Sequence, residues 1–456
     1  NAGAFLHRVG GDWTNNGATF NPGTGRITLD GSALQTLGGT VANTFNRLTL
    51  NNAAGASLGS NLLINDSLVF RNGVIATGTD TVKMGVNADH DGEGAGTYVN
   101  GNLLWNLPTG ASVQRTFFIG DASVYAPVDI DLSGISTAGT LTGSTTAGDH
   151  PSIATSGINA AKSANRYWTM NSSGLVFTDY DAVFNFGAGD VDAGADPLAF
   201  LANKLTGTVW TNLSLGTLAA TSTQVTGLTS FSDFQLGECA IPAIHNMTGG
   251  GTYCPGGTGF NLGLDNSDTL VSYQLYLNDT TAVGAPVPGD DGNPISFGAL
   301  TDSGTYTVVA THQISSCEED MAGTAVIALF TPPSASVLTG DTCICLGGTA
   351  TVYVNITGGL SPYTVVLDTG GGDTTLVGYV SGTGITFTRN TDLTITLDSV
   401  ADNNGCASLG VSGTASITID LSSPTFTVPA SITIYKGAAC SLDADTSITG
   451  GVDDAA

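Results

Sequence analysis

The stretch Thr248-Gly-Gly-Gly-Thr-Tyr-Cys-Pro-Gly-Gly-Thr258 recurs 91 residues later as Thr339-Gly-Asp-Thr-Cys-Ile-Cys-Leu-Gly-Gly-Thr349. One further cysteine follows each copy, Cys317 after the first and Cys406 after the second. The spans from Cys254 to Cys317 and from Cys345 to Cys406 are 63 and 61 residues. A fixed spacing of this kind is typical of tandem repeats, and here it indicates a repeated unit of about 90 residues.

The segments that precede the later cysteines have the pattern of β-strands. Gly304-Thr-Tyr-Thr-Val-Val-Ala310 and Leu393-Thr-Ile-Thr-Leu397 alternate in side-chain polarity, as half-buried strands do. Short alternating strands between glycine-rich turns are typical of β-sandwiches. We therefore predict two homologous β-sandwich modules, at residues 239–331 and 332–424.

The repeat also predicts how the cysteines pair. We expect one early-to-late disulfide in each module, Cys254–Cys317 and Cys345–Cys406. Each bond is expected to stabilise its module by about 4 kcal/mol through the lost entropy of the unfolded chain. Disulfides form in oxidising compartments, so this pattern places the protein outside the cell.

Three cysteines have no partner in this scheme: Cys239, Cys343 and Cys440. Cys239 and Cys343 each lie near the start of a module, so they are candidates to pair with each other, whereas Cys440 is left over. Zinc binding is the weaker alternative for this set. The Cys343-x-Cys345 spacing is tighter than zinc sites use, and the sequence has no second CxxC motif.

Charge and composition exclude several classes of protein. The 456 residues carry a formal net charge of −27, although only 11% of them are charged. Residues 1–238 contain nine Lys and Arg against 18 Asp and Glu, while residues 239–456 contain two against 20. Residues that favour helix interiors are scarce, which argues against a helical bundle. The shortage of basic residues argues against nucleic-acid binding.

The first half divides into two regions by strand length. Residues 1–105 contain very short apolar bursts between Asn and Gly, at intervals that suit a β-solenoid or, alternatively, an antiparallel sandwich. We predict the solenoid. Residues 106–238 contain longer strands rich in aromatic residues, such as Arg166-Tyr-Trp-Thr-Met170, and we predict a β-sandwich with these aromatics in its core rather than on a sugar-stacking surface.

Several motifs together resemble those of a known class of protein. Gly11-Asp-Trp-Thr-Asn-Asn-Gly17 and Phe45-Asn-Arg-Leu-Thr-Leu-Asn-Asn52 look like β-solenoid segments of large secreted surface proteins of Bacteroidota. Arg166-Tyr-Trp168 and Ser230-Phe-Ser-Asp-Phe234 resemble the domain that commonly follows, and the cysteine modules are similar to the Ig-like repeats of the same proteins.

The resemblance implies a multidomain, adhesin-like or structural surface protein exported by the type IX secretion system. It carries over no catalytic residues. The segment that begins at Cys440 looks like the opening of another repeat, so we expect residues 425–456 to be the start of a further, truncated β module. The odd cysteine is what such a truncation leaves.

One acidic loop is a candidate calcium site. Asp190, Asp192 and Asp196 place carboxylates at nearly alternate positions around Gly194. Calcium prefers several oxygen ligands, which a short glycine-containing loop can supply. The loop lacks the twelfth-position glutamate of an EF-hand, so a solvated acidic turn is the alternative. No other cofactor is expected.

O-glycosylation is a second expected modification. The resemblance implies the Bacteroidota pattern of Asp followed by Ser or Thr and then an apolar residue or Thr. The matching hydroxyl residues are Ser67, Thr81, Thr269, Thr280, Thr374 and Ser399.

The sequence favours a protein without catalysis. The histidines adjoin no nucleophile motif, so no catalytic residues are predicted. We expect an extracellular structural or adhesive surface protein, a stalk or filament component whose partners are its own copies, surface proteins or glycans. The alternative is a carbohydrate-binding or accessory region of a larger secreted enzyme. No apolar run approaches the roughly 18 residues of a membrane-spanning helix, so membrane insertion is not expected.

Overall fold

The computed structural model describes residues 2–17 and 20–422, and these are built almost wholly from β-strands. Their helical segments are three short 3-10 turns, η1 (Ile153–Thr155), η2 (Ala188–Asp190) and η3 (Pro197–Ala199). The prediction of an all-β protein is confirmed. No helix in this part of the chain is long and apolar enough to cross a membrane. The module predicted at 425–456, with Cys440, lies outside the described residues.

The chain forms two compact units, each built from two separate segments of the sequence. The first unit runs to Gly251 and resumes over Gly259–Ile327. The second comprises Thr252–Thr258 and the chain from Ala328 onward. The short segment Thr252–Thr258 thus lies in sequence within the module predicted at 239–331 but packs with the unit that follows.

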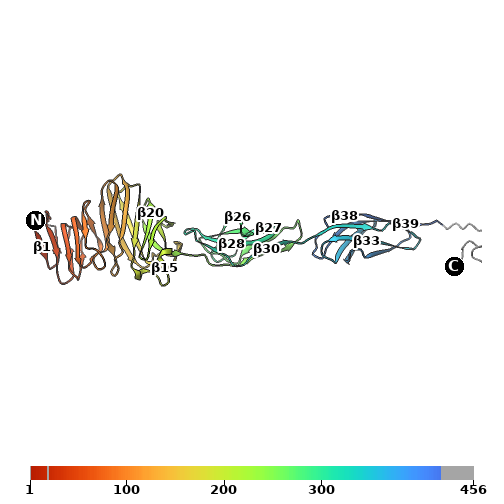
Figure 1. Cartoon of the computed structure of the whole chain (residues 1–456), viewed down its shortest axis with the longest axis horizontal. Helices are drawn as coiled ribbons and strands as arrows, with labels where there is room; N and C mark the ends of the chain where they lie inside the picture. Colours follow the sequence, from red (N-terminus) through yellow and green to blue (C-terminus); the bar gives the residue numbers. More distant parts are fainter. Residues whose placement is uncertain (1, 18–19, 423–456) are drawn as a thin grey trace, which may run out of the picture. The chain divides into compact units, whose positions relative to one another are not determined.

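A parallel β-solenoid opens the first unit, as predicted (Figure 1). Leu6 pairs with Arg26, Arg26 with Arg47, and Arg47 with Ser67, so each turn of the solenoid takes 20 or 21 residues. A second, shorter ladder closes each turn on another side. The strands of the first ladder are β1 (Leu6–Val9), β3 (Arg26–Leu29), β5 (Asn43–Asn51), β7 (Leu62–Asn72), β8 (Ile75–Met84) and β10 (Val99–Leu107); those of the second are β2 (Trp13–Thr14), β4 (Gln35–Gly38) and β6 (Ala56–Leu58).

Residues at equivalent positions in successive turns of the solenoid stack on one another. Leu29, Leu50 and Phe70 are partners in register and are all buried, so they form one apolar column inside the solenoid. At a corner, the buried amide of Asn52 donates to the carbonyl oxygens of Ala33 and Gly55. Stacked aliphatic residues and corner asparagines explain why very short strands suffice here.

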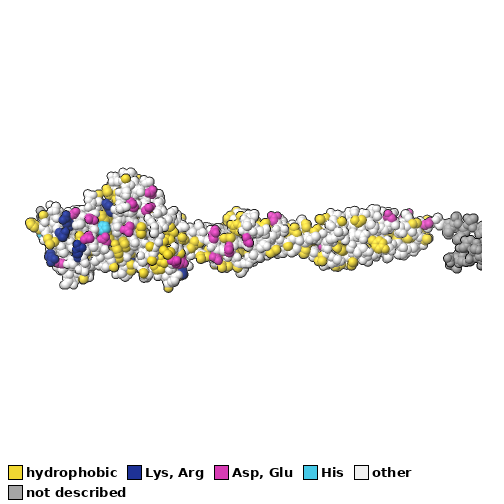
Figure 2. Space-filling model, viewed as in Figure 1, with side chains coloured by type: hydrophobic (Ala, Val, Ile, Leu, Met, Phe, Trp, Pro, Cys, Tyr) yellow, Lys and Arg dark blue, Asp and Glu magenta, His cyan; other side chains and the backbone are white. Residues whose placement is uncertain are grey.

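Five of the eleven Lys and Arg residues of the chain lie on this solenoid. Ion pairs join neighbouring turns, namely Arg8–Asp30 at 3.3 Å, Arg71–Asp91 at 3.1 Å, and Arg47–Asp66. Figure 2 shows these Lys and Arg side chains gathered over the solenoid. The arginines are about half exposed or more, so each pair is expected to contribute no more than about 1 kcal/mol.

Strand β10 joins the solenoid to the region that follows. One edge of β10 pairs in parallel with β8, and the other edge pairs antiparallel with β14 (Gly139–Ala147). The sheet continues through β15 (Ile158–Ser173), β21 (Asp233–Cys239), β17 (Leu201–Thr206) and β18 (Val209–Asn212). The boundary predicted at 105/106 therefore falls inside a strand, and the antiparallel strands cover the open end of the solenoid.

A second sheet packs on these antiparallel strands. Its order is β11-β13-β16-β20-β19, with bounds Gly110–Phe117, Val128–Ile135, Asp179–Asn185, Ser222–Leu228 and Leu215–Ala219. Trp168, Phe184 and Phe234 lie between the two sheets with 1% exposure or less. The aromatic residues of this region are core residues, as predicted.

The rest of the first unit is a smaller sandwich. It contains a three-stranded sheet of β22 (Met247–Thr248), β24 (Phe260–Leu264) and β27 (Ile295–Leu300). The other sheet contains β28 (Gly304–His312), β25 (Val271–Leu277) and β26 (Thr281–Pro288), with β29 (Glu318–Asp320) beside β28. It also takes in β23 (Gly251–Tyr253) and β30 (Ala325–Leu329), whose last two residues each belong to the second unit. The predicted strand 304–310 lies in β28 and alternates in burial as expected.

The second unit is a sandwich of two β-sheets. One sheet has the order β36-β33-β31-β38 (Gly384–Thr388, Thr349–Gly358, Pro333–Thr339, Val411–Ser412), and the other has the order β32-β39-β37-β34-β35 (Thr342–Cys345, Thr414–Asp420, Leu393–Ala401, Tyr363–Asp368, Asp373–Tyr379). Val352, Val365, Ile395 and Ile417 are fully buried between the sheets. The predicted strand 393–397 lies in β37.

Candidate functional site

An open pocket of about 510 Å³ lies on the outer face of the second sheet of the first unit. Strands β11, β13, β16 and β20 form its floor, and β9 (Asp89–Asp91) with β10 forms one wall. Because side chains alternate along a strand, every second residue of the floor points into the pocket while its neighbours point into the core.

Two rows of side chains cross the floor of the pocket. Gln114, Asp131 and Asp181 are cross-strand partners in one row. Thr116, Asp129, Val183 and Gln224 are partners in the next. Neighbouring strands of this sheet are not consecutive in the chain, so the first row spans 67 positions of the sequence and the second spans 108.

The carboxylates of the floor accept hydrogen bonds from neighbouring polar side chains. Asp131 accepts from Ser112 Oγ and Gln114 Nε2, both at 2.9 Å. Asp129 accepts from Thr116 Oγ1 at 2.6 Å. Asp131 and Asp181 face each other as like charges on adjacent strands, an arrangement that costs stability. A ligand with amino or hydroxyl donors would relieve this repulsion.

The wall beside the acidic floor carries one cation. The Arg115 guanidinium lies 4.9 Å from the centre of the Trp105 ring and donates to the carbonyl oxygen of Val86 at 3.0 Å. Partial burial lowers the pKa of Arg115 from its usual value. His90 Nδ1 lies 2.9 Å from Glu93 Oε1.

The pocket is suited to a polar ligand. Trp105 is only 1% exposed and lies beneath Arg115, so it cannot act as a stacking surface for a sugar ring. The carboxylates accept hydrogen bonds, while Arg115 and the amides of Gln114 and Gln224 can donate them. This set matches a hydroxyl-rich or amine-bearing ligand.

Sequence reasoning did not find this pocket. Asp129-Ile-Asp131 and Asp179-Tyr-Asp181 do show carboxylates at alternate positions, a pattern that puts charge on one face of a strand. The pattern alone does not tell which strands are neighbours. The pocket exists because β13 lies between β11 and β16.

The predicted calcium residues each have other partners. Asp190 is buried and binds Arg166 through both carboxylate oxygens, at 3.0 Å each. Asp192 accepts from the Ser163 amide and Asn165 Nδ2, and Asp196 accepts from the Leu198 amide. In the described part of the chain, no group of three or more acidic, His or Cys side chains is arranged to hold a metal. Calcium binding at this loop stays a prediction, to be checked by titrating the Tm with Ca²⁺.

The predicted cysteine pairing is wrong. The disulfides join Cys239 to Cys317 and Cys254 to Cys406, with Cα–Cα distances of 6.3 and 5.3 Å. Cys254 cannot close its own module because its segment, Thr252–Thr258, packs in the second unit, where Cys406 lies. Cys239, left unassigned by the sequence, lies at the end of β21 and takes Cys317 instead.

Among the described residues, Cys345 therefore has no disulfide partner, and neither does Cys343. Both thiols are exposed on β32, two positions apart on the same face of the strand. The suggested pairing of Cys239 with Cys343 is also wrong, since Cys239 is bonded to Cys317.

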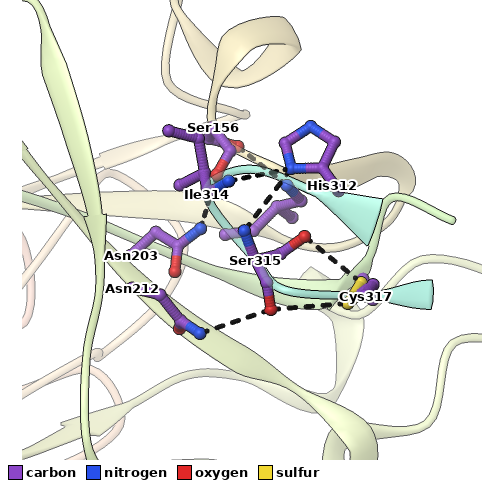
Figure 3. The surroundings of a disulfide bond; sticks show 9 residues. Ser156, Asn203, Asn212, His312, Ile314, Ser315 and Cys317 are labelled. Carbon is purple, nitrogen blue, oxygen red and sulfur yellow. Dashed lines mark hydrogen bonds between the residues drawn. A yellow bond between two sulfur atoms is a disulfide. The ribbon is translucent and has the colours of Figure 1, made fainter. Parts of the chain in front are cut away.

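The Cys239–Cys317 bond lies in a packed joint inside the first unit (Figure 3). Asn212 Nδ2 donates to the Ser315 carbonyl oxygen at 3.5 Å, and the Ala240 amide donates to the Gly157 carbonyl oxygen at 2.9 Å. His312 Nδ1 accepts from the backbone amides of Ile314 and Ser315, at 3.3 and 3.4 Å. The small sandwich is thus fixed to the larger one by a disulfide and by polar contacts.

His312 should make this joint sensitive to acid. Burial lowers the pKa of His312 from its usual value of about 6.5, because the buried ring disfavours the cation. The unfolded chain therefore takes up a proton that the folded chain does not, and stability is lost as the pH falls below that value. We expect the Tm of the first unit to drop between pH 8 and pH 5, and the drop to be smaller in His312→Asn.

Thermal unfolding followed by tryptophan fluorescence measures this, since all four tryptophans lie before residue 239. His7→Asn is the matched control and should keep the pH dependence of the wild type. An unchanged pH dependence in His312→Asn would refute the assignment to His312.

The predicted glycosylation residues lie on the surface or close to it. Thr269, Thr280 and Ser399 are exposed, while Ser67, Thr81 and Thr374 are half-buried. Modification of these residues stays a prediction, and the intact mass of native protein would test it.

Comparison with known proteins assigns no family to this chain. No protein-family model matches the chain, and no curated protein is similar to it in sequence. The three-Ig ectodomain of mouse nectin-like molecule 4 is 12% identical over 47% of this chain and 83% of its own, with a TM-score of 0.20. Titin domains I67–I69 are 12% identical over 53% and 92%, with a TM-score of 0.23. The three N-terminal domains of the bacteriophage RB49 outer capsid protein Hoc are 12% identical over 56% and 94%, with a TM-score of 0.22. At these scores, no partner or activity is transferred to this chain.

Proposed function

We propose that this chain is an extracellular structural or adhesive surface protein, a stalk or filament component without catalysis. The observation that carries the proposal is the pair of long-range disulfides, Cys239–Cys317 and Cys254–Cys406, in a chain built of β-sandwiches. Such bonds persist in oxidising compartments, which supports a location outside the cell. Export by the type IX system in a member of the Bacteroidota belongs to the proposal through the resemblance of the sequence motifs.

The surface charge supports the same role. A net charge of −27 keeps the domains of one chain and of neighbouring chains from collapsing onto one another. Figure 2 shows Asp and Glu side chains spread over both the solenoid-bearing region and the small sandwiches. Partners in this role are other copies of the chain, surface proteins or glycans.

Electron microscopy and thiol trapping on intact cells test the proposal together. We expect immunogold label on the cell surface, on thin stalks or on regular filaments, and we expect Cys254 and Cys406 to resist alkylation unless a reductant is added. A cytoplasmic protein whose four bonded cysteines react at once with the alkylating agent would contradict the proposal.

A carbohydrate-binding region of a larger secreted enzyme is the second candidate, and the pocket is the observation that favours it. Glycan-array binding by the wild type should fall at least about tenfold in Asp131→Asn, because a hydrogen bond to a charged group is worth about 1.5–3 kcal/mol. Asp302→Asn, exposed and outside the pocket, should bind as the wild type does. A wild type that binds no glycan, or equal binding by both variants, would reject this candidate.

A further inference from the structure

The two disulfides interleave along the chain. In sequence order the four cysteines are Cys239, Cys254, Cys317 and Cys406, and the bonds join the first to the third and the second to the fourth. The separations that they close are 78 and 152 residues. The order predicted from the repeat would instead give two separate loops, one inside each module.

Interleaved bonds change the covalent route that a pulling force follows. From residue 239 to residue 406, the shortest route runs along the backbone to Cys254 and then crosses the disulfide to Cys406. Fully extended, this route reaches only about 60 Å, whereas the backbone alone would reach about 580 Å. Tension applied at the two ends of the chain is carried by the shorter route.

We propose that the Cys254–Cys406 bond shields residues 255–405 from tension, so that the chain acts as a load-bearing connector in which this segment stays folded under force. β38 and β39 follow Cys406 and, like residues 240–253, remain on the loaded route. This inference rests on the proposed structural role for its biological use, although the force path itself follows from the pairing alone. The strands that would otherwise unravel, from β24 through β37, all lie inside the bypassed segment.

The stretch that does carry the load is held by its own contacts. Residues 240–253 contain β22 and β23. Within the first unit, Asn246 donates to Asp265 from its amide and from Nδ2, at 2.9 and 2.8 Å. His245 Nε2 lies 3.1 Å from Asp268 Oδ1, and the Ala243 amide donates to Asp268 Oδ2 at 2.9 Å. The carboxylates of Asp265 and Asp268, from another part of the same sandwich, thus hold residues 240–253 in place.

The second bond has a different place in the force path. Cys239–Cys317 lies on a longer route while Cys254–Cys406 is intact, so removing it should leave the maximal extension unchanged. If Cys254–Cys406 is lost, the Cys239–Cys317 bond becomes part of the shortest route and still bypasses residues 240–316. The two bonds therefore provide alternative routes for the load, a main one through Cys254–Cys406 and a reserve through Cys239–Cys317.

Single-molecule force spectroscopy on the full chain, held by handles at both ends, tests the proposal. The observable is the contour-length deficit of the oxidised chain relative to the same chain in reductant. We expect a wild-type deficit of about 530 Å, equal to the 152 residues closed by the main bond. Unfolding steps from residues 255–405 should appear only after reductant is added.

Paired variants assign the deficit to each bond. In a background of C343S, C345S and C440S, each variant keeps only two cysteines, so its remaining bond is known even if the variant folds poorly. C239S/C317S should keep the deficit of about 530 Å, and C254S/C406S should show about 270 Å.

A wild-type deficit of about 420 Å would indicate the separate loops Cys254–Cys317 and Cys345–Cys406, and it would overturn the proposal. So would a deficit of about 270 Å, or unfolding steps from residues 255–405 in the oxidised wild type. These outcomes are independent of the surface-localisation test, because contour length depends only on covalent connectivity. Failure of the proposed function and failure of the force path can therefore be told apart.

Discussion

Arg166→Met is expected to destabilise the first unit by about 3–5 kcal/mol. The Arg166 side chain is fully buried on β15 and pairs with Asp121 at 2.7 Å and with Asp190 at 3.0 Å. Its Nη1 also donates to Thr145 Oγ1 at 3.2 Å. Methionine would leave two carboxylates in a water-poor site without a counter-charge, and that uncompensated charge is the main cost.

The contribution of Asp121 to this cluster of Arg166, Asp121 and Asp190 depends on pH. Burial opposes ionisation of Asp121, but hydrogen bonds from the amides of Ser123 and Val124, together with Arg166, hold the pKa of Asp121 below its ordinary value. Stability from this group is present at neutral pH and is lost as the pH falls through the lowered pKa. Protonation of Asp121 should therefore cause little loss of stability above pH 5.

Urea unfolding followed by tryptophan fluorescence measures the loss in Arg166→Met. Arg8→Met is the matched control, because the Arg8–Asp30 ion pair is on the surface and its arginine is 68% exposed. We expect the control to lose less than about 1 kcal/mol. Equal losses of unfolding free energy in the two variants would show that the buried Arg166 ion pairs stabilise the fold no more than the exposed Arg8–Asp30 pair does.

C254S/C406S is expected to destabilise the second unit by about 5 kcal/mol, from the restored entropy of the unfolded loop of 152 residues. The bond joins Thr252–Thr258 to the turn after β37, near a core formed by residues such as Val352 and Ile395. Loss of the bond lets that segment leave the unit. A single small sandwich has little stability to spare, so local opening should become frequent.

Hydrogen exchange measured by mass spectrometry locates the effect. Peptides from β33 and β37 should exchange faster in C254S/C406S than in the wild type. C239S/C317S is the matched control, and it should affect β28 in the first unit while β33 keeps its protection. Unchanged protection of β33 in C254S/C406S would contradict the expected stabilisation.

Much of the fold could be predicted because local patterns decide it. Alternation in residues 304–310 and 393–397 predicts strands, and both segments are strands with alternating burial. The regular bursts of residues 1–105 predict a solenoid, since each turn must place apolar residues at the same positions for stacking. These properties depend on neighbours in the sequence.

The cysteine pairing depends on long-range folding, and here the repeat was misleading. Spans of 63 and 61 residues suggest that each module closes on itself. The repeat does not reveal that Thr252–Thr258 packs with the following sandwich. Which cysteines meet is decided by that packing, because a disulfide requires Cα atoms within about 7 Å of each other.

The candidate sites show the same contrast. Asp190 looked available for calcium because its partner, Arg166, lies 24 positions away on β15. Asp129, Asp131 and Asp181 could not be grouped from the sequence because their strands become neighbours only in the sheet. Alternating carboxylates place charge on one face of a strand, but the order of the strands decides which faces form a pocket.

The pairing of the bonded cysteines is the central claim, since the joint, the proposed role and the force path all depend on it. Peptide mapping of the native, non-reduced protein, with thiols blocked before digestion, tests it most directly. The structure predicts one linked peptide pair containing Cys239 and Cys317 and another containing Cys254 and Cys406, with Cys343 and Cys345 blocked. Linked peptides joining Cys254 to Cys317 and Cys345 to Cys406 would contradict the account.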